Sequence, residues 1–306
     1  MIPPINFSET FRDADPRWAS NLISKIGNPP SIKTHPVFCL WSDLLGFSNI
    51  FKESNWSPDD NQKRKIYDRL VAAHSSALYF SDPFERDLIL NDGIAKVFIP
   101  KSKQEDRDNI LSISLFLRSC VQMHLAINQY EKEKGLPGCR SILAFGENIE
   151  YLAEEIRFDD YFYNYSKQSG EDISVAAKRA GNPIVIYNPK ELQMNTAFSK
   201  AFILESGGTK AGLRGNEFYI DQSVIDAISR YSIDKGYKPI WRVKEDCIEY
   251  FIPREEGHTD LVVIGFEFDK EQISTQGLNY NSRVYKVNRF YPFDEKTSEF
   301  YFDMHC

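Results

Sequence analysis

Two kinds of apolar pattern alternate along the chain up to about residue 235. Short continuous apolar runs, such as residues 37–42, are typical of buried strands. Longer stretches with apolar residues every three or four positions are typical of helices that pack one face on a core. Beyond residue 235 strand-like runs dominate. The pattern predicts an α/β (α+β) fold, in which helices cover a sheet and a β-rich C-terminal extension follows.

The expected elements run in the order strand, helix, β-hairpin, long helix, strand, helix and strand, with one more helix before the extension. We expect them at residues 37–42, 60–78, 87–90 with 94–99, 104–134, 139–146, 190–205, 218–220 and 223–231, with a further short strand at 184–187 and extension strands at 247–252, 261–268, 284–290 and 300–304. This organisation predicts three parts: an N-terminal extension (1–35), a main domain (36–235) and the β-rich extension (236–306).

Local signals fix the start of the first long helix. Residues 57–60 (Ser-Pro-Asp-Asp) are typical of a helix start, because proline suits the first turn and acidic residues favour the positive end of the helix dipole. Tyr67, Leu70, Val71 and His74 recur at intervals of three and four residues, so we expect them to share one face of this helix.

The hairpin and the next helix are also marked. Asn91, Asp92 and Gly93 separate two apolar runs, which is a strong signal for a tight β-hairpin with Asp92 at its tip. In the long helix that follows, His124 falls among apolar positions, so we interpret it as a packed residue rather than a metal ligand.

Composition and charge narrow the class of protein. The chain has 306 residues, of which 42% are hydrophobic and 26% charged, as in ordinary soluble domains. Its formal charge of −7 argues against binding a nucleic acid polymer, although a local basic pocket for a triphosphate stays open. The five cysteines are scattered without a Cys-x-x-Cys pair, which indicates free thiols in a reducing compartment.

No targeting or membrane segment is expected. The N-terminus lacks the basic start and apolar core of a signal peptide. The most apolar later stretch, residues 110–127, contains Arg118, Gln122 and His124 and is not a credible membrane span. We therefore expect a cytoplasmic location and no membrane partner.

One stretch joins a buried strand to a charge. The apolar run at 37–42 leads into Asp43, and a Gly-Phe-Ser turn follows at 46–48. A carboxylate at the end of a buried strand needs hydrogen-bond donors, a basic residue or a metal ion, and a nearby glycine lets backbone amides approach a ligand. This combination is typical of a metal ion beside a phosphate group. The alternative is that Asp43 only ends the strand and caps the next helix.

Asp43 and Asp92 are both carried by expected strands, although they lie far apart in the sequence. If the first strand pairs beside the hairpin, the two carboxylates converge, and they repel each other unless cations lie between them. Divalent metal ions that also bind substrate phosphates are the usual solution. Asp43 and Asp92 are therefore the candidate catalytic residues.

Four segments in this order resemble motifs of class III nucleotide cyclases. Residues 42–48 (SDLLGFS) resemble the Asp-Ile-Val-Gly-Phe-Thr segment of that family, and residues 91–95 (NDGIA) stand where it has a Gly-Asp hairpin. Residues 140–147 (RSILAFGE) are similar to its Arg-Gly-x-Ile-x-x-Gly strand, and residues 198–206 (FSKAFILES) to its Val-Asn-x-Ala-x-Arg-Leu-Glu helix. The stand-alone form most resembles the pyrimidine cyclases of bacterial anti-phage (Pycsar) defence.

The resemblance implies the class III cyclase βαββαβ sheet and a two-metal mechanism. Asp43, Asp92 and the backbone carbonyl of Leu44 would hold two Mn²⁺ or Mg²⁺ ions. The substrate would be a nucleoside triphosphate, and the products a 3′,5′-cyclic nucleotide and pyrophosphate. The family works as a head-to-tail homodimer with active sites at the interface, and in this branch the cyclic product acts on a separate effector protein.

The resemblance also implies how the substrate is held. Backbone amides around Gly46, Phe47 and Ser48 would cradle the phosphates at a helix N-terminus. Arg140 and Lys200 are candidate substrate ligands. The alternatives are that Arg140 pairs with an acid on a neighbouring strand and that Lys200 is a solvated helix residue.

The last motif departs from the family at the positions that stabilise the transition state. When the helix is aligned on Glu205, the family's Asn falls at Ser199 and its Arg at Ile203, which cannot stabilise phosphoryl charge. Either Lys210 or one of the two cations named above supplies this charge, or the domain is slow or inactive. The second hypothesis is therefore a catalytically degenerate module that binds a nucleotide or a partner without turnover.

Base specificity and reaction class leave further alternatives. Purine cyclases place a base-reading Lys or Glu four residues before the hairpin Asp, where this chain has Leu88. This favours a smaller base, from UTP or CTP. A different two-metal enzyme, such as a phosphodiesterase, is a third hypothesis, and the lack of a His/Asp ligand cluster in the sequence counts against it.

Overall fold

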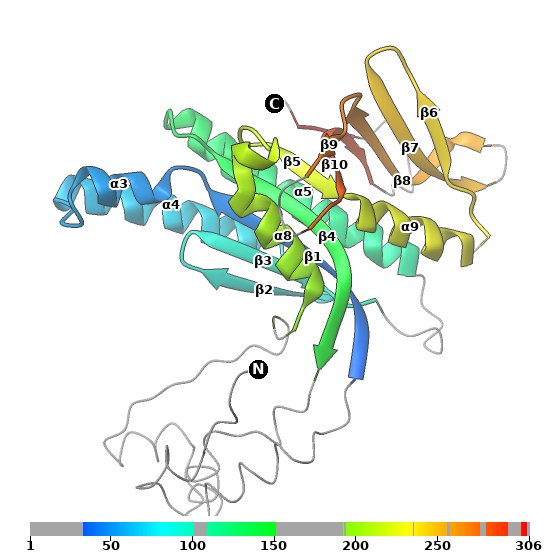
Figure 1. The fold of residues 1–306 in the computed structure, drawn as a ribbon, viewed down its shortest axis with the longest axis horizontal. Coiled ribbons are helices and arrows are strands. Elements are labelled where there is room, and N and C mark those ends of the chain that lie inside the picture. Colours follow the sequence, from blue (N-terminus) through cyan, green and yellow to red (C-terminus); the bar gives the residue numbers. More distant parts are fainter. Residues whose placement is uncertain are drawn as a thin grey trace, which may run out of the picture. The chain divides into compact units, whose positions relative to one another are not determined.

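The computed structural model describes residues 33–100, 109–150, 192, 194–234, 236–255, 258–275, 280–292 and 301–304. Contacts divide the chain into two compact units, one made of Met1–His35 with Ile149–Met194 and the other of Pro36–Asn148 with Asn195–Cys306. The second unit contains every candidate site residue. The helices and strands are labelled in Figure 1. The domain boundaries that the sequence suggests at residues 35 and 235 stay a prediction.

The structure contains the following helices and strands, in chain order. The first group is β1 (Lys33–Leu44), α3 (Phe47–Glu53), α4 (Asp60–Tyr79), β2 (Glu85–Leu90), β3 (Gly93–Phe98), α5 (Asn109–Glu133), β4 (Cys139–Glu150), α8 (Thr196–Gly207), the 3₁₀ turn η2 (Gly208–Ala211), β5 (Phe218–Asp221) and α9 (Gln222–Asp234). The extension holds β6 (Ile240–Val243), β7 (Cys247–Glu255), β8 (His258–Asp269), β9 (Ile273–Ser274), β10 (Arg283–Tyr291) and β11 (Phe302–Asp303).

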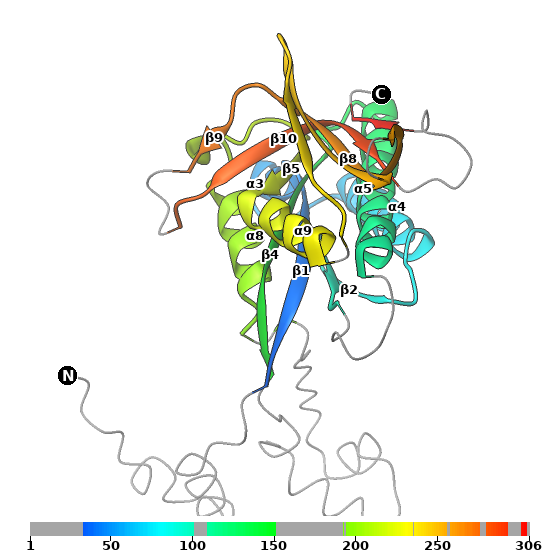
Figure 2. The same cartoon turned by 90° about the vertical axis from the view of Figure 1, so that its right-hand side faces the viewer.

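The strands join in one sheet in the order β2-β3-β1-β4-β5-β10-β8-β7-β6. β4 and β5 are parallel, whereas β1 and β3 and the extension strands pair antiparallel. Helix α8 lies on one face of β1 and β4, and α4 and α5 lie on the other (Figure 2). The extension therefore continues the sheet through β10, which pairs with β5.

The expected βαββαβ order is confirmed: β1, α4, the β2–β3 hairpin, α5 and β4 follow one another, and from residue 236 on the described elements are all strands. Helix α8 begins at Thr196 and not near residue 190, because Asn195 is extended, bridges to Asn148 and caps the helix by accepting from the Phe198 amide at 2.9 Å. The short strands β6 and β9 were not predicted, since so few residues give no clear periodicity. The start of α3 was implied only by the resemblance. The expected strand at 184–187 lies outside the described residues.

The buried face of α4 includes residues outside the three- and four-residue pattern seen in the sequence. Its predicted start is confirmed, with a capping box between Asp59 and Gln62. The buried positions, however, are Arg69, Ala73 and Ala77, whereas Tyr67 and Val71 are 59% and 43% exposed. Small alanines let α4 lie close to α5, and Arg69 is buried because it has a charged partner there, as described below. Of the apolar residues in the sequence pattern, Leu70 packs against the core, whereas Tyr67 and Val71 are exposed.

Helix α5 runs through the core. Among the helices of the described ranges, it alone is long and apolar enough to cross a membrane, yet 61% of its most apolar window is buried inside the structure. We expect an inner stripe of Ile110, Ile113, Leu117, Val121, His124 and Leu125 from the sequence. All of these residues are buried except Leu125, which is partly buried and packs against the core. These are the properties of a core helix. The cytoplasmic location stays a prediction.

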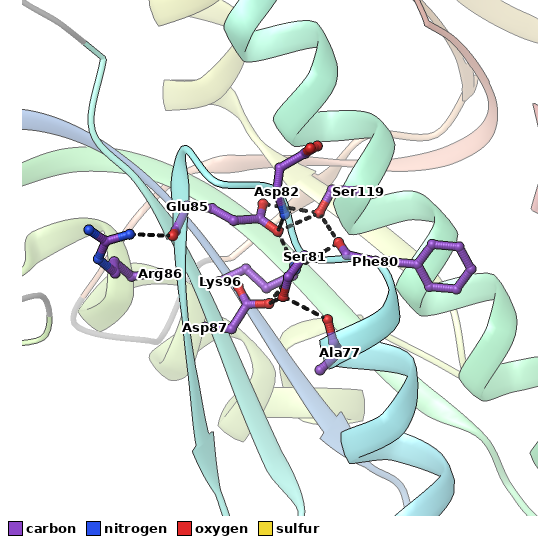
Figure 3. A network of polar contacts seen from close by, with 9 residues as sticks. All are labelled: Ala77, Phe80, Ser81, Asp82, Glu85, Arg86, Asp87, Lys96 and Ser119. Carbon is purple, nitrogen blue, oxygen red and sulfur yellow. Dashed lines mark hydrogen bonds and ion pairs between the residues drawn. The ribbon is translucent and has the colours of Figure 1, made fainter.

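A buried ionic cluster anchors the β2–β3 hairpin to the helices (Figure 3). Lys96 on β3 is fully buried, and its Nζ donates to Glu85 Oε1 and Asp87 Oδ2 on β2, each at 2.7 Å. Ser119 on α5 donates to the carbonyl of Phe80 at 2.6 Å and lies 2.8 Å from Glu85 Oε1. The cluster joins both hairpin strands to α5 and to the end of α4, and so fixes the hairpin that carries Asp92.

Replacing the central cation of this cluster should strongly destabilise the fold. Lys96→Met leaves two buried carboxylates without their counter-ion, so we expect the free energy of unfolding to fall by about 3–5 kcal/mol, measured by urea denaturation. Lys63→Met is the matched control, because Lys63 and its partner Asp60 are 63% and 98% exposed, and it should change stability by less than about 1 kcal/mol. Equal losses in the two variants would contradict the anchoring role.

Candidate functional site

Strand pairing places Asp43 beside the hairpin turn that carries Asp92. β1 and β3 are antiparallel with Asp43 opposite Gly93, and the Leu44 amide donates to the Asp92 carbonyl at 3.3 Å. The pairing needs glycine at position 93, since a Cβ there would lie 2.2 Å from the Trp41 ring. Asn91 has a positive φ of 61° in the turn, and its side chain donates to Asp92 Oδ1 at 2.9 Å. Both aspartates therefore lie at one edge of the sheet.

The carboxyl group of Asp43 lies in a poorly solvated, acidic environment. Burial raises the pKa of Asp43 to about 7, and the negative charges of Glu205 and Asp92 add to the increase. The guanidinium groups of Arg140 and Arg69 oppose it. Near neutral pH a substantial fraction of Asp43 is therefore protonated unless a cation approaches.

Arg140 forms a buried ion pair with Glu205 near Asp43. Arg140 lies on β4 and is 9% exposed; its Nη2 and Nε donate to Glu205 Oε1 at 3.1 and 3.3 Å, and its Nη1 donates to the Leu213 carbonyl at 2.8 Å. Arg140 does pair with an acid, but this acid lies on helix α8 and not on a neighbouring strand. Its charge still lowers the pKa of Asp43. Its role as a substrate ligand stays a prediction.

A second buried ion pair holds the loop after Asp43. Arg69 on α4 donates to both carboxylate oxygens of Glu131 on α5, at 2.9 and 2.7 Å, and to the Leu45 carbonyl at 3.1 Å. The Leu45 amide donates to the Gly138 carbonyl at 2.8 Å. Since both backbone groups of Leu45 are engaged, the loop has a fixed path away from Asp43.

This loop leads into helix α3 at Gly46–Ser48. Gly46 is the N-cap residue with a φ of 64°, and no side chain forms a capping hydrogen bond. Asp43 therefore does not cap the next helix, which removes that alternative. Phe47 is buried with the Arg69 guanidinium 5.6 Å from its ring centroid, whereas Gly46 and Ser48 are exposed. The phosphate-binding role of Gly46, Phe47 and Ser48 stays a prediction.

A buried polar chain lies on the opposite face of β1 from Asp43. Ser42 Oγ contacts Ser141 Oγ on β4 at 2.7 Å, and Ser141 Oγ contacts His124 Nδ1 on α5 at 2.9 Å. Burial lowers the pKa of His124 to about 3, so its imidazole is neutral at physiological pH. The interpretation of His124 as a packed residue is confirmed. This chain of contacts aligns the ends of β1 and β4.

Lys200 lies away from Asp43. Its Nζ donates to the Phe145 carbonyl on β4 at 2.8 Å and lies over the Tyr280 ring at 5.5 Å. Ser141 lies at the end of β4 that is next to Asp43, because its Oγ contacts Ser42 Oγ on β1. Phe145 is four residues further along β4, a distance of roughly 13 Å. The contacts of Lys200 therefore give no support to a role in binding the same substrate phosphates.

The donor set at Asp43 and Asp92 fits a hard divalent cation. Carboxylate oxygens are the ligands that Mg²⁺ and Mn²⁺ prefer, and such an ion would offset the repulsion that helps to raise the pKa of Asp43. In the part of the chain that the structure describes, no third His, Cys, Asp or Glu joins these two at metal-ligand spacing. Further ligands would have to be backbone carbonyls, water or substrate phosphates.

One cavity among the described residues lies away from these two acids. It has a volume of about 440 Å³, and Tyr219 of β5 and Lys286 of β10 are among the residues that line it, but neither Asp43 nor Asp92 is. Lys286 pairs with Glu217 at 3.2 Å within the same wall. The candidate site is therefore not part of this cavity.

We did not predict from the sequence the residues that shift the pKa of Asp43 and fix the loop after it. Glu205 served only to align the helix motif, and Arg69 and Glu131 were not considered. A signal was present: Arg69 precedes Ala73 and Ala77 at intervals of four, and Glu131 continues the inner stripe of α5. One basic and one acidic residue on the inner faces of neighbouring helices indicate a buried ion pair.

Comparison with known proteins adds little beyond the fold. No protein-family model and no curated protein sequence matches the chain. Among solved structures, the guanylyl cyclase Cya2 aligns with 12% identity and a TM-score of 0.42, over 88% of this chain and 96% of that one. The adenylyl cyclase CyaB from P. aeruginosa aligns with 12% identity and a TM-score of 0.36, over 84% and 95%. At these values neither likeness is evidence for a family or an activity.

The raised pKa of Asp43 predicts a pH-dependent loss of stability without divalent metal. The folded state holds the proton more tightly than the unfolded chain, so the contribution of Asp43 becomes unfavourable as pH rises from about 4 to about 7. Asp43→Asn should therefore melt a few degrees higher than the wild type at about pH 8 in EDTA, and the difference should shrink towards about pH 4. Glu53→Gln, at an exposed position, should show no such trend. Parallel melting curves at all pH values would contradict the assigned environment.

Proposed function

We propose that the chain is a metal-dependent nucleotidyl cyclase, which converts a nucleoside triphosphate into a 3′,5′-cyclic nucleotide and pyrophosphate. The observation that carries the proposal is the convergence of Asp43 and Asp92 at the paired ends of β1 and β3, where their charges repel each other. The four cyclase-like segments supply the reaction class, and two of them contain these acids.

The residues of the chain have separate tasks in this mechanism. Bound Mg²⁺ or Mn²⁺ would supply Lewis-acid stabilisation of the α-phosphate and would lower the pKa of the ribose 3′-hydroxyl. Asp43 and Asp92, with the Leu44 carbonyl, would hold the ions. Asp43 has to lose its proton to do so, and the nearby Arg140 favours that ionised form. The Arg69–Glu131 pair keeps the following loop in position.

We also propose a pyrimidine substrate, UTP or CTP, and a cyclic nucleotide signal for anti-phage defence that acts on a separate effector. Support for the smaller base comes from Leu88, which is 6% exposed on β2 and has no polar group with which to recognise a purine. The defence role rests on the resemblance of the motifs alone.

A homodimer with shared active sites belongs to the same proposal. Phe202 and Ile203 are 45% and 38% exposed on α8, the helix that also supplies Glu205 next to Asp43. Large apolar side chains exposed close to a site are typical of a surface covered by a partner.

The second candidate function is a degenerate module that binds a nucleotide or a partner without turnover. Two observations favour it. Ser199 and Ile203 replace the family's transition-state residues at exposed positions of α8, and Arg140 and Lys200, two of the cations that could replace them, are engaged with other groups.

Incubation with nucleotides tests the proposed activity. The protein with Mn²⁺ should form a cyclic product, detected by mass spectrometry, from at least one of ATP, GTP, CTP and UTP, supplied separately. Asp43→Ala and Asp92→Ala should each lower the rate at least 100-fold, because each removes a metal ligand. Asp68→Ala is the control and should keep the wild-type rate, since the Asp68 side chain is 42% exposed and pairs with the exposed Arg64 on the same helix. An active Asp43→Ala protein would refute the metal assignment.

Restoring the missing arginine separates the two candidate functions. If the chain turns over slowly because it lacks this charge, Ile203→Arg should raise the cyclisation rate about tenfold or more, as arginine stabilises the transferring phosphoryl group. Ile203→Met keeps the size of the side chain without the charge and should leave the rate unchanged. If neither the wild type nor Ile203→Arg forms product while both are folded, the non-catalytic module is the better description.

A further inference from the structure

A second group of metal-ligand side chains lies in the C-terminal extension. Cys247, Glu249 and Glu267 each offer a ligand atom, and these atoms all lie within 4.8 Å of one another. The register of β7 and β8 explains the grouping: Glu249 is directly opposite Glu267, and Cys247 precedes Glu249 by two residues and so shares its face. Two like charges directly opposite each other destabilise a strand pair unless a cation balances them.

The buried carboxylate of Glu249 is only half satisfied. Its side chain is 7% exposed, and Oε1 accepts from Lys244. The other oxygen, Oε2, is buried and has no hydrogen-bond partner among the described residues. Arg242 is opposite Glu249 on β6, yet its guanidinium lies over the Phe251 ring instead. A buried, unpartnered oxygen on the Glu249 carboxylate, which belongs to this group, indicates a missing partner such as a cation.

The two neighbouring basic side chains do not prevent the group from binding a metal ion. Lys244 is 56% exposed, and Arg289, which contacts Glu267 Oε2 at a long 3.4 Å, is 40% exposed. Both side chains reach the acids from solvent, so they can move aside when an ion enters. Cys247 and Glu267 are themselves partly exposed, which gives an ion a path to the site.

We propose that Cys247, Glu249 and Glu267 form a zinc site that links β7 to β8. A thiolate with two carboxylates suits Zn²⁺, whereas Mg²⁺ and Ca²⁺ prefer oxygen ligands alone. In a tetrahedral zinc site the ligand atoms lie about 3.3–3.8 Å apart, so only small side-chain shifts are needed from the present spacing. Binding converts the Cys247 thiol to a thiolate and releases its proton. Water fills the fourth position.

This site is independent of the proposed catalytic one. In the sheet, β4, β5 and β10 lie between β1, which carries Asp43, and β8, which carries Glu267. The two sites also differ in ligand type, because Asp43 and Asp92 offer only oxygen. The zinc site joins two neighbouring extension strands, so it stabilises the β7–β8 hairpin and supplies no group to cyclisation.

Metal titration of the full chain tests the proposal. After treatment with EDTA, the protein should bind one Zn²⁺ per chain in competition with a chromophoric chelator, and Co²⁺ in its place should give a thiolate-to-cobalt charge-transfer band. Cys247→Ser and Glu249→Gln should each weaken Zn²⁺ binding at least tenfold, and Cys247→Ser should remove the band. Circular dichroism checks that each variant is folded. If one variant does not fold, Zn²⁺ binding by the other variant tests the proposal.

Two control variants locate the ion. Glu245→Gln changes an exposed acid in the turn between β6 and β7, two residues before Cys247. Asp43→Asn alters only the candidate catalytic site, so both variants should bind Zn²⁺ like the wild type. Loss of Zn²⁺ binding in Asp43→Asn, or wild-type binding in both Cys247→Ser and Glu249→Gln, would overturn the proposal. It would also fail if the folded wild type bound no Zn²⁺ and showed no thiolate band with Co²⁺. None of these outcomes depends on whether the chain cyclises nucleotides.

Discussion

The antiparallel register of β1 against β3 is the constraint on which the candidate site depends. It sets Asp43 opposite Gly93 and so next to Asp92. Trp41 holds this register, because its ring covers Gly93 so closely that no Cβ fits there, and it packs against Phe198 and Phe202 of α8 on its other side. One indole therefore couples the hairpin, the first strand and the helix that carries Glu205. A shift by one residue would turn Asp43 to the opposite face of the sheet.

Three buried ionic groups surround this register and hold the elements that bear the site. Lys96 joins the hairpin strands to α5, Arg69 joins α4, α5 and the loop after Asp43, and Arg140 joins β4 to α8. Buried ion pairs are a costly way to stabilise a fold, since well-packed apolar residues are often as good or better. Their directional hydrogen bonds, however, fix positions that apolar contacts leave loose. We infer that they are present for the geometry of the Asp43 edge more than for overall stability.

Much of this fold could be predicted from the sequence, because its strongest signals are local. The turn residues at 91–93 fix the hairpin, and proline and acids at 57–60 fix the start of α4. The convergence of Asp43 and Asp92 followed from element order. The charged neighbours of Asp43, Glu205 and Arg140, could not be predicted from the element order, because they meet only through the packing of α8 on β4. The burial of Arg69 on α4 was not predicted, since apolar spacing gives no weight to a buried arginine with an acid partner.

The charges around Asp43 also restrict the alternatives to catalysis. Three carboxylates, those of Asp43, Asp92 and Glu205, lie near two guanidinium groups. Arg140 pairs with Glu205 and Arg69 pairs with Glu131, so neither cation neutralises Asp43 and Asp92. The edge is thus net negative and repels a triphosphate as it stands. Two divalent ions would reverse that sign. A module that only bound nucleotides here would need the same ions as an enzyme. Metal-dependent nucleotide binding is therefore common to both hypotheses. The hypotheses differ over the positive charge that is missing at Ile203, because such a charge would stabilise the transition state and contribute little to binding.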